Sequence, residues 1–227
     1  MRRILPIGHI LFILAVLFTG SFIENTYYFQ LLVFVGIHTL LALGLNMLMG
    51  YAGQISLGHA AFYGIGAYTT AVLTATYGFS PWAALPCAIL LASAVAYVVG
   101  LPTLKLSGYY LGMGTLGFGM IGFIVFREWS SLTGGSSGFV GIPPLEIGPV
   151  SFYSGRSYFF LVWAVVLGTI ILCQRLIDSR MGRALRSIHD SEKASRAIGV
   201  DTMALKLRVF VFSAAVAALA GFLYAHF

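Results

Sequence analysis

The chain has 227 residues, of which 59% are hydrophobic and only 9% are charged. Soluble domains carry about 25% charged residues, so this composition excludes an ordinary soluble protein and predicts one integral membrane domain. The formal net charge of +6 does not indicate nucleic-acid binding, because the basic residues concentrate in one segment. The two cysteines, Cys87 and Cys173, lie in apolar stretches and are interpreted as buried small hydrophobic residues.

Two apolar stretches near the N-terminus predict the first two membrane spans. Residues 4–18 are apolar and follow Arg2 and Arg3, a pattern that signal peptides share with first transmembrane helices. A poor cleavage site follows, and more apolar stretches come after it, so a retained first helix is predicted. The second span is predicted for residues 30–49.

Residues 51–67, with the sequence YAGQISLGHAAFYGIGA, lead into a third span that ends near Tyr77. Glycine costs about 1 kcal/mol relative to alanine inside a helix, so its density here predicts an interrupted or very tightly packed helix. Irregular backbone survives in lipid only inside protein or beside a wet cavity. Gln54, Ser56 and His59 are therefore candidates for a solute path, although packing roles fit them equally well. The sequence leaves open whether this stretch crosses the membrane or re-enters it.

The fourth and fifth spans, residues 81–99 and 108–126, carry small residues at helical spacing. Such faces let transmembrane backbones approach closely. The small residues are Ala84, Ala88, Ala92 and Ala96 in the first of these spans, continued by Gly100 directly after it, and Gly108, Gly112, Thr115, Gly119 and Gly122 in the second. Gly112 and Gly119 are predicted to line or shape the solute path.

The distribution of basic residues predicts the orientation. A long polar loop containing TGGSSG precedes a sixth span at residues 158–177, and a seventh span covers residues 209–227. With the N-terminus inside, all of the 13 Lys and Arg residues except Arg127 and Arg156 fall on the inner side. This agrees with the positive-inside rule. The predicted fold class is an all-α, polytopic transmembrane bundle of about seven spans with a cytoplasmic N-terminus.

The charged segment, residues 178–208, predicts two short helices at the inner end. The first would separate apolar residues from basic ones, with Met181, Leu185 and Ile188 on one face and Arg183 and Arg186 on another. The predicted helix-end residues are Asp190 or Ser191, Gly199 and Asp201. This order favours docking to a partner. A basic loop held on anionic lipid is the alternative.

The residues that carry chemistry in other membrane proteins are sparse here. None of the predicted spans contains Asp or Glu deep inside, which counts against proton or sodium coupling. The sequence contains neither a zinc-protease HExxH motif nor a nucleophile paired with a base, so a membrane enzyme is not predicted. It also lacks GxxxxGK[ST]. If ATP drives transport, another subunit must therefore bind it, and no cofactor is expected in this chain.

Four blocks together resemble the LivM-type permease family of ATP-binding-cassette importers for branched-chain amino acids. They are GLNMLMGYAGQISLGHAAFYGIGAYT at residues 44–69, PTLKLSGYYLGMGTLGFG at residues 102–119, SLTGGSSGFVGIPP at residues 131–144, and GRALRSIHDSEKASRAIGVDTMALKLRVFVFSAAVAALAGFLYA at residues 182–225. The blocks cover most of the chain from Gly44 onward, and their order matches the family.

The resemblance implies import of leucine, isoleucine and valine across a bacterial inner membrane. It implies four kinds of partner: a homologous LivH-type permease, two cytoplasmic ATPase subunits, a periplasmic amino-acid-binding protein, and membrane lipid. Residues 178–208 would couple to an ATPase through Arg183, Arg186, Ser191, Glu192 and Gly199. The outer loop would meet the binding protein through Thr133, Gly134, Gly135 and Gly138.

Several alternatives stay open at the level of sequence. A related importer for urea, short amides or other amino acids would look similar. A partner-free channel for a small neutral solute, or a purely structural membrane subunit, would also suit glycine-rich helices. Family members continue past the position of Phe227, so residues 1–227 are expected to be one permease domain that is incomplete at its C-terminus.

Overall fold

The computed structural model describes residues 4–227 except residue 24 and residues 136–137, 148–149 and 153–154. The regular secondary structure of the described part is helical apart from one hairpin of two-residue strands, β1 (Glu146–Ile147) and β2 (Val150–Ser151). Its helices are α1 (Ile4–Phe22), α2 (Thr26–Leu45), the π-helical turn η1 (Asn46–Tyr51), α3 (His59–Ala71), the π-helical turn η2 (Val72–Thr76), α4 (Pro81–Thr103), α5 (Tyr109–Glu128), α6 (Ser130–Thr133), α7 (Gly155–Asp178), α8 (Arg180–Asp190), α9 (Glu192–Ala197) and α10 (Thr202–Ala225).

Five of these helices are long and apolar enough to cross a membrane. They are α2 extended by η1, α4, α5, α7 and α10. The predicted all-α bundle is thus confirmed, whereas the count of seven spans is not. The first predicted span contributes a shorter described apolar helix, residues 8–22. The third is not among the five. Its helix, α3 continued by η2, begins only at His59, because the chain between Ala52 and His59 forms no helix.

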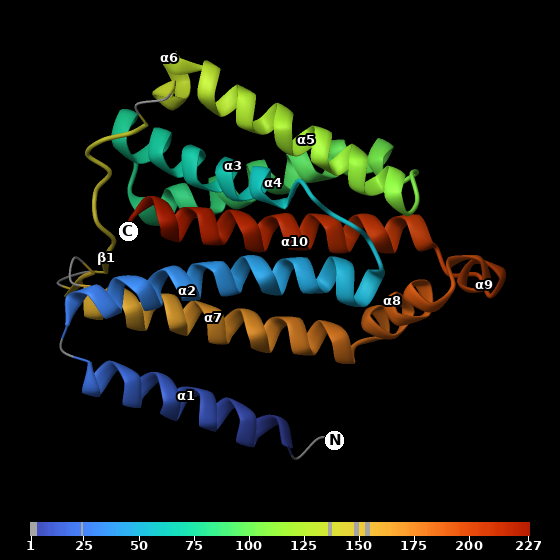
Figure 1. The fold of residues 1–227 in the computed structure, drawn as a ribbon, viewed down its shortest axis with the longest axis horizontal. Helices are drawn as coiled ribbons and strands as arrows, with labels where there is room; N and C mark the ends of the chain where they lie inside the picture. Colours follow the sequence, from blue (N-terminus) through green and yellow to red (C-terminus); the bar gives the residue numbers. More distant parts are fainter. Residues whose placement is uncertain (1–3, 24, 136–137, 148–149, 153–154) are drawn as a thin grey trace.

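The long helices lie roughly parallel and antiparallel, with α10 in the middle of the bundle (Figure 1). In α10, 61% of the most apolar window is buried, compared with 17% in α5. α10 contacts α2, α3 and α4, while α7 packs on α2 and carries α1 on its other side. Figure 1 also shows that the chain returns from the end of α2 toward the middle of the bundle before α3 begins.

The close contact between α3 and α10 depends on glycine. A Cβ at Gly66 would overlap the backbone of Ala218, and a Cβ at Gly221 would overlap the carbonyl of Tyr63. Ala218 and Gly221 are one turn apart on the same face of α10. Because these residues expose backbone to backbone, the two helices pack closer than larger side chains would allow.

Side-chain caps fix where several helices begin. The Asn25 side chain accepts a hydrogen bond from the Tyr27 N–H at 3.0 Å at the start of α2. Ser80 caps α4 in the same way, and Pro81 occupies its first turn. The predicted caps of the charged segment are also confirmed, with Ser191 at the start of α9 and Asp201 at the start of α10. Gly199, between them, has a φ of +84°.

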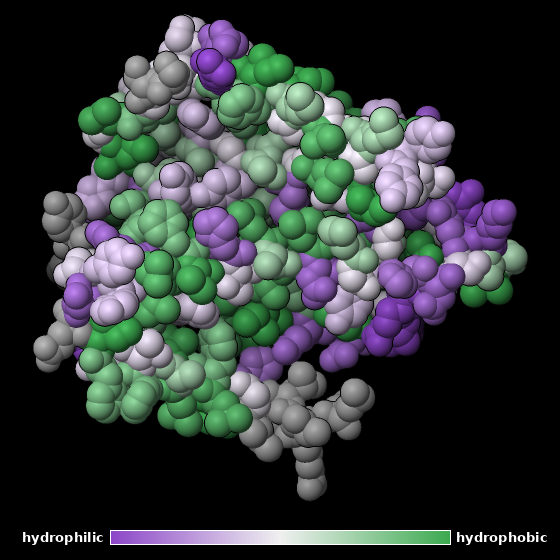
Figure 2. Space-filling model, viewed as in Figure 1, coloured by the Kyte–Doolittle hydropathy of each residue, from purple (hydrophilic) through white to green (hydrophobic). Residues whose placement is uncertain are grey.

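Charge is segregated between the two ends of the bundle. The α8 end holds Lys105, in the turn between α4 and α5, and all the basic residues from Arg175 to Arg208. Figure 2 shows hydrophilic residues gathered over α8 and α9 at this end. Arg127 and Arg156 lie at the other end, called the α6 end, where α5 finishes and α7 begins. Arg2 and Arg3 lie outside the described residues.

Candidate functional site

The non-helical segment between Ala52 and His59 is the most unusual feature of the bundle interior. The turn η1 ends α2 with widened helical geometry, and Gly53 then takes a φ of +63°, which favours glycine. The Gln54 N–H donates to the Leu48 carbonyl at 3.0 Å and so caps the C-terminal end of η1. The sequence prediction of an interrupted helix is therefore confirmed.

Three polar side chains around this break are buried inside the bundle. Gln54, Ser56 and His59 are only 2%, 5% and 4% exposed, respectively. Within the described part of the chain, none of their side-chain nitrogen and oxygen atoms has a hydrogen-bond partner. Leaving such a group unpaired costs about 1–3 kcal/mol, so these residues carry a cost that ordinary packing does not require.

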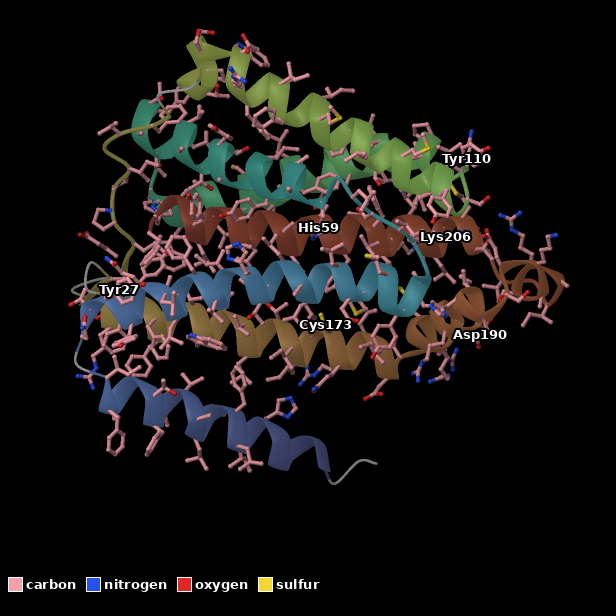
Figure 3. The ribbon with its side chains drawn as sticks, in the orientation of Figure 1. Tyr27, His59, Tyr110, Cys173, Asp190 and Lys206 are labelled. Carbon is pink, nitrogen blue, oxygen red and sulfur yellow. The ribbon has the colours of Figure 1, made fainter. Side chains whose placement is uncertain are left out.

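His59 and Ser213 converge on one point of α2. A Cβ at Gly44 would lie 3.1 Å from His59 Nε2 and 3.2 Å from both the Oγ and the carbonyl oxygen of Ser213. Ser213 is fully buried near the middle of α10, and its hydroxyl also lacks a partner among the described residues. Figure 3 shows His59 at about half the length of the bundle, where α2 and α10 run side by side. α3 and α10 thus bring two polar side chains together against the backbone of α2.

The small face of α5 covers the broken segment. The Leu57 N–H donates to Thr115 Oγ1 at 3.0 Å, and that hydroxyl donates in turn to the Gly112 carbonyl at 2.9 Å. Gly119 lies against Gly58, since a Cβ at Gly119 would be 3.0 Å from the Gly58 Cα. Gly112 and Gly119 are therefore brought to the same segment as Gln54 and Ser56, as a shared role in one path would require.

The broken segment also contacts the charged segment. A Cβ at Gly53 would lie 3.2 Å from Cδ2 of His189, in the last turn of α8. This contact joins the bundle interior to a helix that lies at the α8 end. A movement of α8 would therefore be transmitted directly to the backbone at Gly53.

α8 is held against the end of α7. Leu185 and Ile188 are buried on one side, while Arg183 Nη1 donates to the Asp178 carbonyl at 3.2 Å and Arg186 Nη2 to the Ile177 carbonyl at 2.9 Å. Cations at the last carbonyls of a helix suit its negative end. The predicted amphipathic helix is confirmed, and its arginines remain exposed at the surface.

Glu192 joins α9 to α10. Its carboxylate pairs with Arg196 at 2.7 Å and with the largely buried Lys206, and it accepts from the Thr202 hydroxyl at 3.2 Å. Burial raises the pKa of Glu192, but the hydrogen bond and charge of Lys206, with the charge of Arg196, outweigh it and lower the pKa overall. The carboxylate is thus charged at neutral pH and fixes the angle between α9 and the bundle (Figure 3 labels Lys206).

The tip of the charged segment presents an apolar side chain. Ile198, which follows α9, is 77% exposed, and the neighbouring Gly199 has open space where a Cβ would be. A single exposed apolar residue does not by itself mark a contact surface, but Ile198 is accessible to a molecule that approaches the α8 end. Ser191, the remaining predicted coupling residue, is used locally as the cap of α9.

At the α6 end, the predicted contact residues form a tight turn. The Thr133 hydroxyl donates to the carbonyls of Phe126 and Trp129 at 2.7 and 2.8 Å. Gly134, Gly135 and Gly138 all have positive φ. Ser136 and Ser137 of the TGGSSG loop lie outside the described residues. Beyond the turn, Val140 is 91% exposed.

The sequence did not single out several residues of these sites. Ser213 and His189 reach their partners only through tertiary contacts. Lys206 lies in the second turn of α10. The exposed Ile198 was visible as an isolated apolar residue in a charged segment, and this signal was missed.

Among the described residues, no group of three or more His, Cys, Asp or Glu side chains could hold a metal. The prediction that the chain binds no cofactor stays a prediction.

Comparison with known proteins identifies relatives over most of the chain. A family model described as "Branched-chain amino acid transport system / permease component" matches residues 27–227. The chain is 34% identical over 212 residues to the high-affinity branched-chain amino acid transport system permease protein LivM of Escherichia coli (strain K12), covering 83% of this chain and 50% of that protein. It therefore spans about half the length of this relative.

More distant relatives include a second type of permease. The chain is 26% identical over 228 residues to the probable branched-chain amino acid transport permease protein LivM of Methanocaldococcus jannaschii, covering 86% of this chain and 66% of that protein. It is 27% identical over 237 residues to the high-affinity branched-chain amino acid transport system permease protein LivH of Salmonella typhimurium, covering 96% of this chain and 72% of that protein. No solved structure matches the chain.

Proposed function

The chain belongs to the family of branched-chain amino acid transport permease components, and on that premise we propose that it forms part of the membrane pathway of an ATP-driven importer for leucine, isoleucine and valine. It works beside a homologous LivH-type permease in a bacterial inner membrane. Two cytoplasmic ATPase subunits supply the energy, and a periplasmic amino-acid-binding protein delivers the solute. The chain itself is not an enzyme, since ATP is bound and hydrolysed on the separate subunits.

The observation that carries this proposal is the shape of the charged segment. α8 is anchored to the bundle through Leu185 and Ile188, and Glu192 fixes α9 to α10. Arg183 and Arg186, which donate to the last carbonyls of α7, lie at the surface of this rigid base. Ile198, which follows α9, is 77% exposed. A rigid projection with basic residues and one apolar residue suits docking on another protein better than a flexible loop on lipid. Residues 178–208 are thus the proposed ATPase-coupling segment.

The bundle interior supports a solute path. The polar residues Gln54, Ser56 and His59 lie at the break in the helix, and Gly112 and Gly119 of α5 pack against it. Toward the α6 end, a groove of about 610 Å³ runs along α3 and α10, with an aromatic lining that includes Phe34, Tyr63, Tyr68, Phe139 and Tyr224. Apolar walls of this kind suit a branched aliphatic side chain. At this end, Thr133, Gly134, Gly135 and Gly138 are the proposed contact with the binding protein.

The experiment is site-directed cross-linking with the partner subunits co-expressed. In a background with Cys87→Ala and Cys173→Ala, a single cysteine is placed at Ile198, directly after α9, or at Val140, between α6 and β1. Both residues are highly exposed, and α9 and α6 lie at opposite ends of the bundle (Figure 1). We expect Ile198→Cys to cross-link to a P-loop ATPase and Val140→Cys to a solute-binding protein. Each variant is the matched control of the other.

Two other results would overturn the proposal. If a stable chain carries out downhill flux without ATP and neither cysteine cross-links, the partner-free channel is the correct function. If both cross-links form but the complex takes up labelled urea or short amides and not labelled leucine, isoleucine or valine, the chain belongs to an importer for those other solutes.

A further inference from the structure

α3 begins inside the bundle with its positive end uncovered. His59 is its first residue, and the residue before it, Gly58, makes no side-chain cap. The first N–H groups of a helix lack intrahelical partners and carry a partial positive charge. α3 and η2 together form a helix of 18 residues. Its N-terminus is therefore able to stabilise an anionic group.

The second observation is the set of unpartnered side chains around this N-terminus. Gln54 and Ser56 precede it by a few residues, His59 opens the helix, and Ser213 reaches it from α10. All four are at least 95% buried. Within the described residues, their six side-chain nitrogen and oxygen atoms have no hydrogen-bond partner. This observation is independent of the helix end, because Ser213 lies on a different helix.

The chemistry of the set selects the ligand. Amide, hydroxyl and imidazole groups all donate hydrogen bonds, and none of the four residues carries a carboxylate that would attract a cation. Donors gathered at a helix N-terminus match a carboxylate, which has two acceptor oxygens and a negative charge. An amino acid presents this group at one end and its apolar side chain at the other.

We propose that the N-terminus of α3, together with Gln54, Ser56, His59 and Ser213, binds the carboxylate of the amino acid while it passes through the bundle. The carboxylate site rests on the proposed import function. It specifies which group of the amino acid the chain recognises. The site is closed in this structure, since its side chains are buried. Gly53 and Gly58, on either side of Gln54 and Ser56, allow the backbone to change, and the contact of Gly53 with His189 links that change to α8.

The test is protection of a cysteine in membranes that contain the co-expressed partners. Ser56→Cys, in the background with Cys87→Ala and Cys173→Ala, is labelled with a membrane-permeant maleimide. The probes are L-leucine and two analogues that each lack one charged group. 4-Methylpentanoate keeps the carboxylate and lacks the ammonium, whereas 3-methylbutylamine keeps the ammonium and lacks the carboxylate. A ligand that covers the cysteine slows labelling by a factor of 1 + [L]/Kd, about fivefold at four times its Kd.

We expect protection by leucine and 4-methylpentanoate but not by the amine. Ser107→Cys, at an exposed turn next to α5, is the matched control, and its labelling should not respond to any probe. Ser213→Cys is the second reporter if Ser56→Cys fails to assemble. Equal protection by the amine, absence of protection by all three probes, or absence of labelling under any condition would overturn the site.

A separate measurement distinguishes failure of the site from failure of the import function. ATP-driven leucine uptake is measured for the unmodified chain with the same partners. Normal uptake combined with an unprotected cysteine rejects the carboxylate site alone. Absence of uptake by the unmodified, assembled complex rejects the proposed function itself.

Discussion

Glu192 stabilises the junction between the charged segment and the membrane helices. Glu192→Gln removes the negative charge and leaves Lys206, which is 8% exposed, without its counter-charge. We expect the free energy of unfolding at pH 7 to fall by about 2 kcal/mol, because hydrogen bonds to charged groups contribute that much. The measurement is unfolding by SDS titration in mixed micelles. Asp190→Asn is the control, since the Asp190 side chain is 85% exposed and exposed pairs contribute about 0–1 kcal/mol.

The same residue predicts a pH dependence. Burial raises the pKa of Glu192, but Lys206 and Arg196 outweigh it, so the pKa lies below the ordinary value of 4.5. Its stabilisation is therefore complete above the ordinary value and is lost as the pH falls through the lowered pKa. The stability difference between the unmodified chain and Glu192→Gln should be constant near neutral pH and shrink below about pH 4. A difference that grows on acidification would contradict this assignment.

Thr115 holds the broken segment through one hydroxyl group. It accepts from the Leu57 N–H at 3.0 Å and donates to the Gly112 carbonyl at 2.9 Å. Thr115→Val keeps the shape but leaves the Leu57 N–H unpaired, which should cost about 1–3 kcal/mol. Thr115→Ser keeps the hydroxyl and should restore most of the stability. The SDS titration measures both variants, and a Thr115→Val variant as stable as the unmodified chain would contradict a stabilising role for the hydroxyl.

The contact between α3 and α10 depends on the absence of side chains. Gly66→Ala puts a Cβ into the backbone of Ala218, and overpacking of this kind costs about 1–3 kcal/mol. Gly168→Ala in α7 has open space around its Cβ and should be neutral or stabilising by up to about 1 kcal/mol. The yield of folded protein on gel filtration, followed by the SDS titration, compares the pair. Equal behaviour would contradict the close packing.

The long helices could be predicted from sequence because apolar length and small-residue spacing are local signals. Four of the five apolar helices lie within a few residues of the predicted spans. The segment before the third span shows the limit. Glycine density predicted an interrupted or tightly packed helix within residues 51–67 without locating the break, which ends at Gly58, where α5 supplies Thr115 as a partner for the Leu57 N–H. A tertiary contact of this kind is absent from local sequence.

The candidate site was predictable only in part, for the same reason. Gln54, Ser56 and His59 were recognised as polar residues in an apolar region, and the structure buries all three. Ser213 lies more than 150 positions later in the chain, in a span that reads as ordinary small-residue packing. Its position beside His59 follows from the packing of α10 against α2 and α3, which no spacing within one helix reveals.

At the scale of the whole molecule, charge segregation predicts how the bundle lies in the membrane. The α8 end carries nearly all the described basic residues, while the α6 end carries Arg127 and Arg156. Moving basic loops across a membrane is unfavourable, so we expect the α8 end to lie in the cytoplasm. The segments that flank α5 offer exposed serines for a matched test, Ser107 in the turn at the α8 end and Ser131 in α6.

We expect a membrane-impermeant maleimide to label Ser131→Cys in spheroplasts and Ser107→Cys only in inverted vesicles. Both cysteines are introduced with Cys87→Ala and Cys173→Ala, so the labelling reports on one site at a time. The reverse pattern would put α8, α9 and Ile198 outside the cell, where no ATPase could reach them, and would remove the basis for energy coupling through residues 178–208. Labelling of both cysteines from one side would mean that α5 does not cross the membrane, despite its 20 apolar-rich residues.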